Sequence, residues 1–507
     1  MMLYKEKFVQ FCKKLVLGLT GIILIFLTYY SLLSTSVLDP LKVETIVYVK
    51  DNIPLLILAA LLLGIEIICL GSLLKTWQPN VVRWRILVSI FVFILGIGWI
   101  LLNKSLPFAD GLMIDQAIDE FAVNDYSQLA PNGYFGKFPF QLNFMLFLQC
   151  LYSFAGNHNY IFLQALNVVS LIITVLLVAN IAGRVFKSTH VEVITLLLSA
   201  LFLPLIFYCS FIYSTIYGLL FSTISLYFMI RYMETHNMKY SFGIILPLLL
   251  AVTLKSNYLI ILIAIICMLV MDMIANKKIA PVVIIVLLLI GQMIPGRLIK
   301  SYYQNATGME ISKGIPSIAW VAMGMENGPK ASGWYNKTMF KSYKKAKYNS
   351  EETAELSKKN ITQRLDYFKD NPNKALVFYR DKTISQWNEP TFESLWVTYH
   401  GPHMKKTPIS SFQKTIFYGK LNKVYLIYTN FYHLIILLFA ISGIYICWKR
   451  HTYAVILFAV IFLGGFFFHT LWEANSKYTI TYFLMLVPYA ASGICLLLNL
   501  TKKGEVK

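Results

Sequence analysis

A stretch that follows a long apolar run concentrates the side chains best suited to acid–base chemistry near a membrane. It spans residues 107–141, reads PFADGLMIDQAIDEFAVNDYSQLAPNGYFGKFPFQ, and contains Asp110, Asp115 and Lys137. A carboxylate close to a bilayer is costly unless it is paired or takes part in function. A positioned carboxylate can accept the proton of a hydroxyl group, and a lysine can neutralise a phosphate. These residue types therefore indicate chemistry at a phosphorylated substrate.

The position of each carboxylate separates the candidates. Asp110 comes within a few residues of the preceding apolar run, so it is the first candidate for a catalytic base. Asp115 and Asp119 lie four residues apart and share one face of a short amphipathic helix. We expect Asp119 to belong to a solvated helix face, and Asp115 to belong either to that face or to the catalytic group. Tyr134, in the turn that leads to Lys137, is a supporting candidate.

Cations at the ends of other apolar runs are candidates for binding the same phosphate. Lys255 lies in the sequence TLKSNYLI between two apolar runs, with a simple loop cap as its alternative role. Lys137 has the alternative role of a lysine that reaches the membrane surface from an apolar segment. Further phosphate-binding candidates lie at the ends of later runs: Arg297, Lys300, Lys477 and Tyr478. Thr215 and Glu473 are supporting candidates at corresponding ends.

These side chains need a membrane-embedded framework to position them. Of 507 residues, 57% are hydrophobic and 14% are charged, against about 25% charged in soluble proteins. Unbroken apolar runs of about 20 residues can cross a bilayer as helices. The composition excludes a soluble globular enzyme and predicts an all-α polytopic membrane protein. We expect about twelve transmembrane helices, over residues 15–36, 53–73, 86–103, 160–182, 191–209, 213–233, 241–254, 257–274, 280–298, 425–447, 452–469 and 478–499.

The distribution of lysine and arginine predicts the orientation of the chain. Basic caps such as Lys75, Arg184 and Lys277 alternate with less basic ones, and basic caps usually face the cytoplasm. Both termini are then expected in the cytoplasm, in a multi-pass protein of the cell membrane. Residues 139–156 are apolar enough to cross, but a crossing would invert the later caps. We therefore expect a juxtamembrane helix there, with a full crossing as the alternative.

The chain divides into four parts in this interpretation. Residues 1–85 carry two extra N-terminal spans, and residues 86–299 form a transmembrane core that includes the external loop 104–159. Residues 300–424 form an extracytoplasmic domain, and residues 425–507 hold the last spans. The extracytoplasmic domain carries about twice as many basic as acidic residues. This excess of positive charge predicts an anionic partner outside the cytoplasm.

The extracytoplasmic domain is expected to be mainly helical. Residues 341–370 and 373–388 each have a helical pattern, and they separate at Asn371-Pro372 because the residue before a proline leaves helical space. The tryptophans of the domain suit either stacking on a ligand ring or packing in the domain core. We expect core packing for most of them: Trp320, Trp334, Trp387 and Trp396.

The first external loop resembles that of a known family. An aspartate just after an early span, an amphipathic helix and the turn NGYFGKFPFQ are similar to the first external loop of GT-C membrane glycosyltransferases. The similarity is greatest to the protein O-mannosyltransferase and lipid A aminoarabinose transferase branch, glycosyltransferase family 39. It covers roughly residues 86–300 and the end of the chain. The resemblance implies a GT-C fold and transfer of a sugar from a polyprenyl phosphate at the outer membrane face.

Residue by residue, the resemblance implies roles for the matching positions. Asp110 matches the catalytic base of the family, Lys137 its phosphate-contacting lysine, and Lys255 resembles a Lys-Pro-Asn type turn of related bacterial enzymes. The closing Glu…Arg-Tyr motif of the family corresponds to three residues near the last span: Glu473, Lys477 and Tyr478. Lysine replaces arginine in this motif, and an ammonium group lacks the bidentate fork of a guanidinium.

One departure from the family affects the expectation of a metal. Ser214 and Thr215 stand where the family usually has a second external acidic residue. Hard divalent cations prefer carboxylate oxygens, so this departure weakens the case for a metal site, although Asp115 is a candidate replacement. We assign no metal ligand and leave a divalent cation open as a cofactor.

Together these features predict an inverting glycosyltransferase that uses a polyprenyl-phosphate hexose or pentose. The expected partners are this donor, membrane lipid, and an extracytoplasmic acceptor that is an anionic glycan or a protein; nucleic acid is not expected. A transporter or flippase for lipid-linked glycans is the main alternative, and a polysaccharide polymerase or ligase is another. A transporter should place its charges within the spans, whereas the candidate residues lie at their ends.

Overall fold

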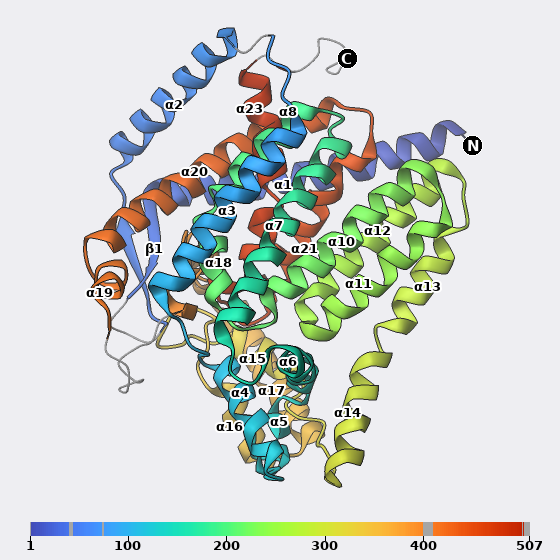
Figure 1. The fold of residues 1–507 in the computed structure, drawn as a ribbon, viewed down its shortest axis with the longest axis vertical. Helices are drawn as coiled ribbons and strands as arrows, with labels where there is room; N and C mark the ends of the chain where they lie inside the picture. The colour runs from blue at the N-terminus through green and yellow to red at the C-terminus, as the bar shows by residue number, and fades with distance from the viewer. Residues whose placement is uncertain (1, 40–43, 74–75, 399–408, 499, 501–507) are drawn as a thin grey trace.

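Long apolar runs form the helices that dominate the structure (Figure 1). The computed structural model describes residues 2–39, 44–73, 76–398, 409–498 and 500. The bundle contains α1 (Met2–Leu33), α2 (Ile53–Leu73), α3 (Val81–Asn103), α7 (Tyr160–Val185), α8 (Thr189–Ala200), α9 (Leu203–Phe207), α10 (Ser214–Thr235), α11 (Ser241–Leu254), α12 (Leu259–Asn276), α13 (Pro281–Gly291), α20 (Lys420–Lys449), α21 (Leu457–Leu471), α22 (Ile480–Leu484) and α23 (Val487–Leu497).

The helix lengths confirm an all-α polytopic membrane protein. Within the described residues, ten helices are long and apolar enough to cross a membrane. The predicted span 191–209 is instead a pair of helices, α8 and a second segment, bent by 58° at a break. Pro204 follows that break, and a proline removes a backbone hydrogen bond and clashes with the preceding turn. The predicted span 241–254 matches a shorter apolar helix, Met238–Leu254.

Between α1 and α2 the chain forms a β-hairpin that the sequence analysis did not predict. Strand β1 (Ser34–Leu38) pairs antiparallel with β2 (Ile46–Lys50), with Ser36 opposite Tyr48. Both strands are rich in β-branched residues and flank the dipeptide Asp39-Pro40 in the sequence, a pattern that favours a hairpin. The predicted span 15–36 is therefore too long at its C-terminal end, because its last residues belong to β1.

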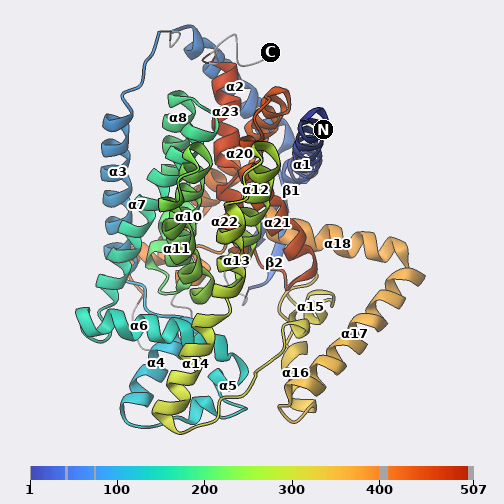
Figure 2. The ribbon, with the colours of Figure 1, turned by 90° about the vertical axis from the view of Figure 1, so that its right-hand side faces the viewer.

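A second group of helices lies at one end of the bundle: α4 (Asp110–Ala122), α5 (Tyr134–Lys137), α6 (Leu142–Ala155), α14 (Ile294–Thr307), α15 (Ile318–Gly324), α16 (Thr338–Lys345), α17 (Ser350–Asp370), α18 (Pro372–Trp387) and α19 (Ser411–Phe417). Figure 2 shows α6 running across the ends of the bundle helices, beside α4 and α14. This placement agrees with the expected juxtamembrane helix. In Figure 1, α1 begins and α23 ends toward the opposite end.

The helix predicted over residues 341–370 is interrupted in the structure. Helix α16 ends at Lys345 and α17 begins at Ser350. Lys347 and Tyr348 between them have φ values of 48° and 65°, which helices do not contain. Asn349 then caps α17, because its side chain accepts a hydrogen bond from the Glu352 backbone N–H at 2.9 Å. The next predicted helix corresponds to α18.

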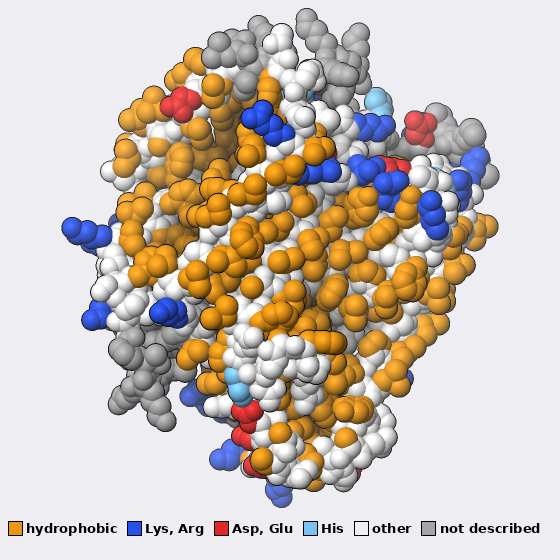
Figure 3. Space-filling model, in the orientation of Figure 1, with side chains coloured by type: hydrophobic (Ala, Val, Ile, Leu, Met, Phe, Trp, Pro, Cys, Tyr) orange, Lys and Arg blue, Asp and Glu red, His pale blue; other side chains and the backbone are white. Residues whose placement is uncertain are grey.

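Hydrophobic side chains cover the bundle. Figure 3 shows them over α3, α7, α10, α11 and α13, with many of the charged side chains gathered beyond the upper and lower edges of this region. Inside, buried apolar side chains of α7, α8, α10, α12 and α20 to α23 form the main core. An apolar surface of this extent suits lipid contact, and the charged edges suit the membrane–water interface.

Candidate functional site

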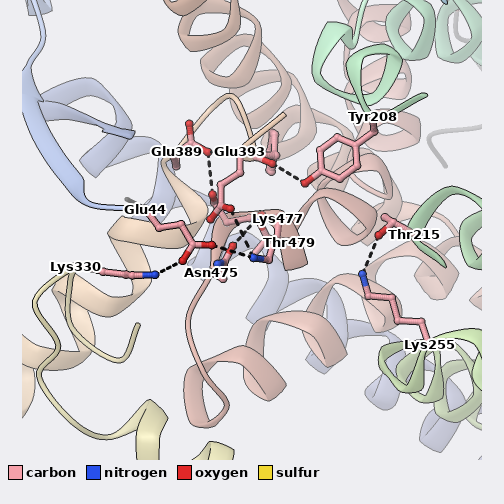
Figure 4. A network of polar contacts seen from close by, with 12 residues as sticks. Glu44, Tyr208, Thr215, Lys255, Lys330, Glu389, Glu393, Asn475, Lys477 and Thr479 are labelled. Carbon is pink, nitrogen blue, oxygen red and sulfur yellow. Dashed lines mark hydrogen bonds and ion pairs between the residues drawn. The ribbon is translucent and has the colours of Figure 1, made fainter. Parts of the chain in front are cut away.

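Lys477 lies at a meeting point of several chain segments. It belongs to the short turn Ser476–Tyr478 between α21 and α22. Its Nζ atom lies 3.2 Å from a carboxylate oxygen of Glu44 and 3.8 Å from one of Glu393 (Figure 4). Glu44 also forms an ion pair with Lys330. One carboxylate from the N-terminal hairpin thus joins two lysines that are far apart in the sequence.

The charges of this group determine its protonation. Burial raises the pKa of the Glu44 carboxyl, but Lys477 and Lys330 outweigh burial and bring that pKa to about 2. Burial lowers the pKa of Lys477, but Glu44 and Glu393 raise it well above the ordinary lysine value. Lys477 therefore stays positively charged, which a phosphate-binding group requires.

Asp110 is the first residue of α4 and lies close enough to Lys477 for the two charges to affect each other. The preceding residue, Ala109, has φ 49° and ψ −125°, a conformation that non-glycine residues rarely adopt. The Asp110 side chain is solvent-accessible, yet burial among protein atoms raises its pKa. Lys477 opposes that rise, with smaller effects from Lys255. The carboxylate is thus accessible to solvent although many protein atoms lie around it.

Lys255 lies between α11 and α12, where Lys477 and Asp110 are close enough to affect its charge. Its Nζ atom donates a hydrogen bond to Thr215 Oγ1 at 2.9 Å (Figure 4). It lies 5.6 Å from the ring centre of Tyr213 and 5.9 Å from that of Tyr478. Burial and the charge of Lys477 lower the pKa of Lys255 to about 7, although Asp110 acts in the opposite direction.

Tyr478 connects the two lysines. The Lys477 Nζ atom lies 5.6 Å from the Tyr478 ring centre, on the ring that Lys255 also approaches. Asp110 is near enough to contribute to raising the pKa values of Tyr478 and Tyr213, after the larger effect of burial. We refer to this group of five neighbouring residues as the Asp110 recess: Asp110, Tyr213, Lys255, Lys477 and Tyr478.

The turn before α6 brings Tyr134 to this recess. Burial, followed by the negative charge of Asp110, raises the pKa of Tyr134 well above its ordinary value. Gly136 allows the tight turn, because a Cβ atom there would lie 1.9 Å from the Ala130 carbonyl oxygen. Lys137, one residue later, is partly buried, and burial lowers its pKa. Lys137 is not among the groups that most affect the pKa of Asp110.

Three further buried carboxylates surround Lys477. Burial raises the pKa of Glu473 to about 7 and that of Glu393 to about 8, and Lys477 opposes both shifts. The Glu393 oxygens have no hydrogen-bond partner among the described residues. Glu389, in contrast, accepts hydrogen bonds from Thr391, from the Glu393 backbone and from Ser476. Glu389 therefore holds the loop together, while Glu393 faces Lys477.

Asp115 belongs to a different group of side chains. Tyr152 and Tyr160 donate hydrogen bonds to it, the latter at 2.6 Å, and His158 lies 3.3 Å away. His158 also lies 3.0 Å from Asp119. Asp115 is thus buried and satisfied by hydrogen bonds at the junction of α4, α6 and α7. These hydrogen bonds tie the helices together, and the partners that they give Asp115 are not members of the Asp110 recess.

Two predicted cations also lie away from the recess. Lys300 donates a hydrogen bond to the Ser312 carbonyl oxygen at 3.1 Å. Arg297 is exposed on the same helix, α14, which packs beside α6. Neither residue is among the groups with the largest effect on the pKa of Asp110 or Lys477.

The tryptophans of residues 300–424 that the structure describes in detail serve mainly for packing. Trp334 and Trp387 are fully buried, and Trp334 donates a hydrogen bond to Ser385 at 2.8 Å. Trp320 is partly buried and stacks on Trp472 with ring centres 5.9 Å apart. Core packing is therefore the role of the two most buried tryptophans.

Sequence reasoning missed Glu44, Lys330 and Glu393. The sequence pattern around Glu44 is typical of a hairpin turn. No local sequence feature, however, indicated that Glu44 lies beside Lys477. Among the described residues, no group of three or more His, Cys, Asp or Glu side chains is arranged to hold a metal ion. The site that the structure presents is therefore a set of carboxylates and lysines.

Comparison with known proteins identifies the family of this chain. Neither curated proteins nor solved structures give a match. A family model described as a conserved hypothetical integral membrane protein matches residues 8–493. The match covers nearly the whole chain, including the hairpin and the Lys477 turn. The chain therefore belongs to this family of integral membrane proteins.

Proposed function

We propose that the protein is an integral membrane glycosyltransferase that moves a sugar from a polyprenyl phosphate to an acceptor outside the cytoplasm. One observation carries the proposal. The accessible carboxylate of Asp110 lies within electrostatic reach of two lysines that approach the same tyrosine ring, Lys255 and Lys477, at the end of the bundle where α6 lies across it. A lipid-linked phosphate reaches such a position from the membrane while its sugar remains in water.

The residues suggest how a single displacement would proceed. Asp110 accepts the proton of the acceptor hydroxyl as that oxygen attacks the anomeric carbon. The bond between that carbon and the phosphate oxygen breaks, and polyprenyl phosphate leaves with the bonding electrons. Lys477 and Lys255 neutralise the charge that grows on the phosphate. The raised pKa of Asp110 makes it a stronger base than an exposed aspartate.

Release of polyprenyl phosphate is the measurement that tests this proposal. The purified protein in lipid nanodiscs is given a set of polyprenyl-phosphate hexoses and pentoses, with a lysate glycan fraction as acceptor. We expect D110N to lower the rate by about 10²- to 10⁴-fold, as loss of a general base does. D125N is the matched control, because Asp125 is an exposed aspartate of the same loop.

The transporter alternative gives a different result in the same variants. Vesicles that contain the protein are loaded with the lipid-linked sugar, and its movement between leaflets is followed. A D110N protein that loses this movement, and a wild-type protein that releases no polyprenyl phosphate from any donor, would together reject the glycosyltransferase proposal.

A further inference from the structure

A separate pocket lies in the extracytoplasmic domain. Its volume is about 360 Å³, within the range of about 300–1,000 Å³ typical of small-molecule sites. Helices α17 and α18 form two of its walls, and Figure 2 shows them meeting at an angle away from the bundle. A turn closed by the bridge between Asn327 and Ser332 forms the third. Its polar and aromatic lining includes Asn327, Ser332, Arg364, Tyr367, Asn373 and Lys374.

Arg364 is held in place with its charge still available. Its Nε atom donates a hydrogen bond to the Met325 carbonyl oxygen at 2.7 Å. Its guanidinium lies 4.3 Å from the ring centre of Phe368 and 5.1 Å from that of Phe378. In the part of the chain that the structure describes, no ion pair uses its terminal nitrogens. A fixed guanidinium with two free terminal nitrogens suits a carboxylate or phosphate group.

Lys374 adds a second cation without a carboxylate partner among the described residues. Its Nζ atom lies 5.6 Å from the ring centre of Tyr367, which is 38% exposed. Asp381 is the acidic side chain of the lining, and it pairs with Arg380 at 2.8 Å. The pocket therefore keeps a net positive charge beside an exposed aromatic ring.

The lining suits an acidic sugar. Amide and hydroxyl groups of Asn327, Ser332 and Asn373 can bond to sugar hydroxyls, and an aromatic ring can pack on the apolar face of a sugar. The two cations would bind an acid group on that sugar. A phosphatidylglycerol headgroup shares the charge but offers no ring face to Tyr367, so the lining favours the sugar over that lipid.

The turn that lines this pocket also reaches the Asp110 recess. Lys330 lies between Asn327 and Ser332, and it pairs with Glu44, which in turn pairs with Lys477. Two residues of extended chain span at most about 7 Å. A polymer held in the pocket would thus lie near the catalytic group.

We propose that this pocket binds an acidic sugar unit of the acceptor, at a distance from the unit that reacts. The role as an acceptor site depends on the proposed glycosyltransferase function, whereas binding of an acidic oligosaccharide does not. The acceptor is then a linear glycan that carries carboxylate or phosphate groups.

Binding of a defined oligosaccharide tests the pocket. Isothermal titration of the full-length protein in nanodiscs compares tetragalacturonate with neutral maltotetraose. We expect tetragalacturonate to bind and K374M to weaken it at least fivefold. R364K keeps the positive charge but loses the two parallel donors of the guanidinium, so it should also weaken tetragalacturonate binding. K359M is the matched control, because Lys359 is an exposed lysine of α17 outside the pocket lining.

Three results would overturn the proposal. These are equal binding of maltotetraose, unchanged binding by K374M and R364K in folded protein, or a K374M effect confined to short-chain phosphatidylglycerol. Thermal unfolding at the wild-type temperature shows that the K374M and R364K variants are folded. Tetragalacturonate binding without any such release in the wild type would reject the glycosyltransferase function and leave the pocket intact.

Discussion

Lys477 keeps a positive charge inside the protein because carboxylates from two distant segments lie beside it. Glu44 comes from the hairpin between α1 and α2, and Glu393 from the loop after α18. Glu44 also neutralises Lys330. Removing one partner of a buried ion pair leaves an uncompensated charge. The N-terminal hairpin thus has an electrostatic role in the site. The two spans on either side of it, α1 and α2, were expected from the sequence only as additions that precede the transmembrane core.

Replacement of Glu44 tests this role. E44Q leaves Lys477 and Lys330 as neighbouring like charges, and we expect a loss of stability of about 3 kcal/mol, typical of a broken buried pair. Thermal unfolding in nanodiscs measures it. E351Q is the control, since the pair of Lys313 and Glu351 is exposed, and we expect no measurable change. An equally stable E44Q protein would show that the pair is dispensable.

Lys255 should make donor binding depend on pH. Its pKa is lowered to about 7, chiefly by burial, so above pH 7 the free protein must take up a proton to bind phosphate. Through Lys255 alone, donor affinity should then fall by at most tenfold for each unit of rise in pH. Glu473 and Glu393 ionise in the same range and add to the fall.

The K255R variant separates these contributions. Arginine stays protonated, so its donor KM should rise less steeply between pH 7 and 9 than that of the wild type. Measurement of KM for the donor in both proteins across this pH range gives the contribution of Lys255. Parallel pH profiles for the two proteins would mean that Lys255 does not bind the phosphate.

At the scale of elements, short irregular segments position the site, while long helices support them. The turn around Gly136 places Tyr134, the start of α4 places Asp110, and the Ser476–Tyr478 turn places Lys477. Each of these short segments is next to a helix that packs against other parts of the protein. A small change in one turn should therefore affect the recess more than a similar change in a lipid-facing helix.

Two glycine substitutions compare a turn with a helix. In G136A the new Cβ atom would lie 1.9 Å from the Ala130 carbonyl oxygen, so the turn must shift. We expect a loss of about 1–3 kcal/mol, as for other overpacked sites, and a lower rate of polyprenyl phosphate release. In G98A nothing lies within 4 Å of the new Cβ atom, and α3 should be unchanged or slightly more stable. Thermal unfolding of both variants gives the comparison, and equal behaviour would contradict it.

At the scale of the whole molecule, the charged groups of the site lie at one end of an apolar bundle. Helices α4 to α6 and α14 to α17 are gathered there, whereas the loop between α12 and α13 lies toward the other end (Figure 2). The proposed reaction requires the first end to face away from the cytoplasm.

Thiol labelling of intact cells tests this orientation. In a protein whose seven native cysteines are replaced, K359C on α17 should react with a membrane-impermeant maleimide, because Lys359 is exposed at the site end. K277C, after α12, should react only in permeabilised cells. The reverse pattern would place the site in the cytoplasm and exclude an extracytoplasmic acceptor.

The sequence by itself determined the helical membrane architecture and pointed to several residues that the structure brings together. Apolar runs of sufficient length have few alternatives to helix in a bilayer, since backbone groups must be satisfied within the segment. The sequence pointed to three charged residues at the ends of apolar runs: Asp110, Lys255 and Lys477. A charged side chain in such a place costs free energy unless it is paired or functional. Local pattern also placed the juxtamembrane helix α6 and the boundary between α17 and α18.

The tertiary structure alone decided which of these charges belong together. It joined Lys477 to Glu44 and Glu393, placed Asp115 among Tyr152, Tyr160 and His158, and left Arg297 exposed on α14. Ion pairs between residues hundreds of positions apart leave no periodic or local signal. They depend on how helices pack, and packing depends on the shapes of many side chains at once.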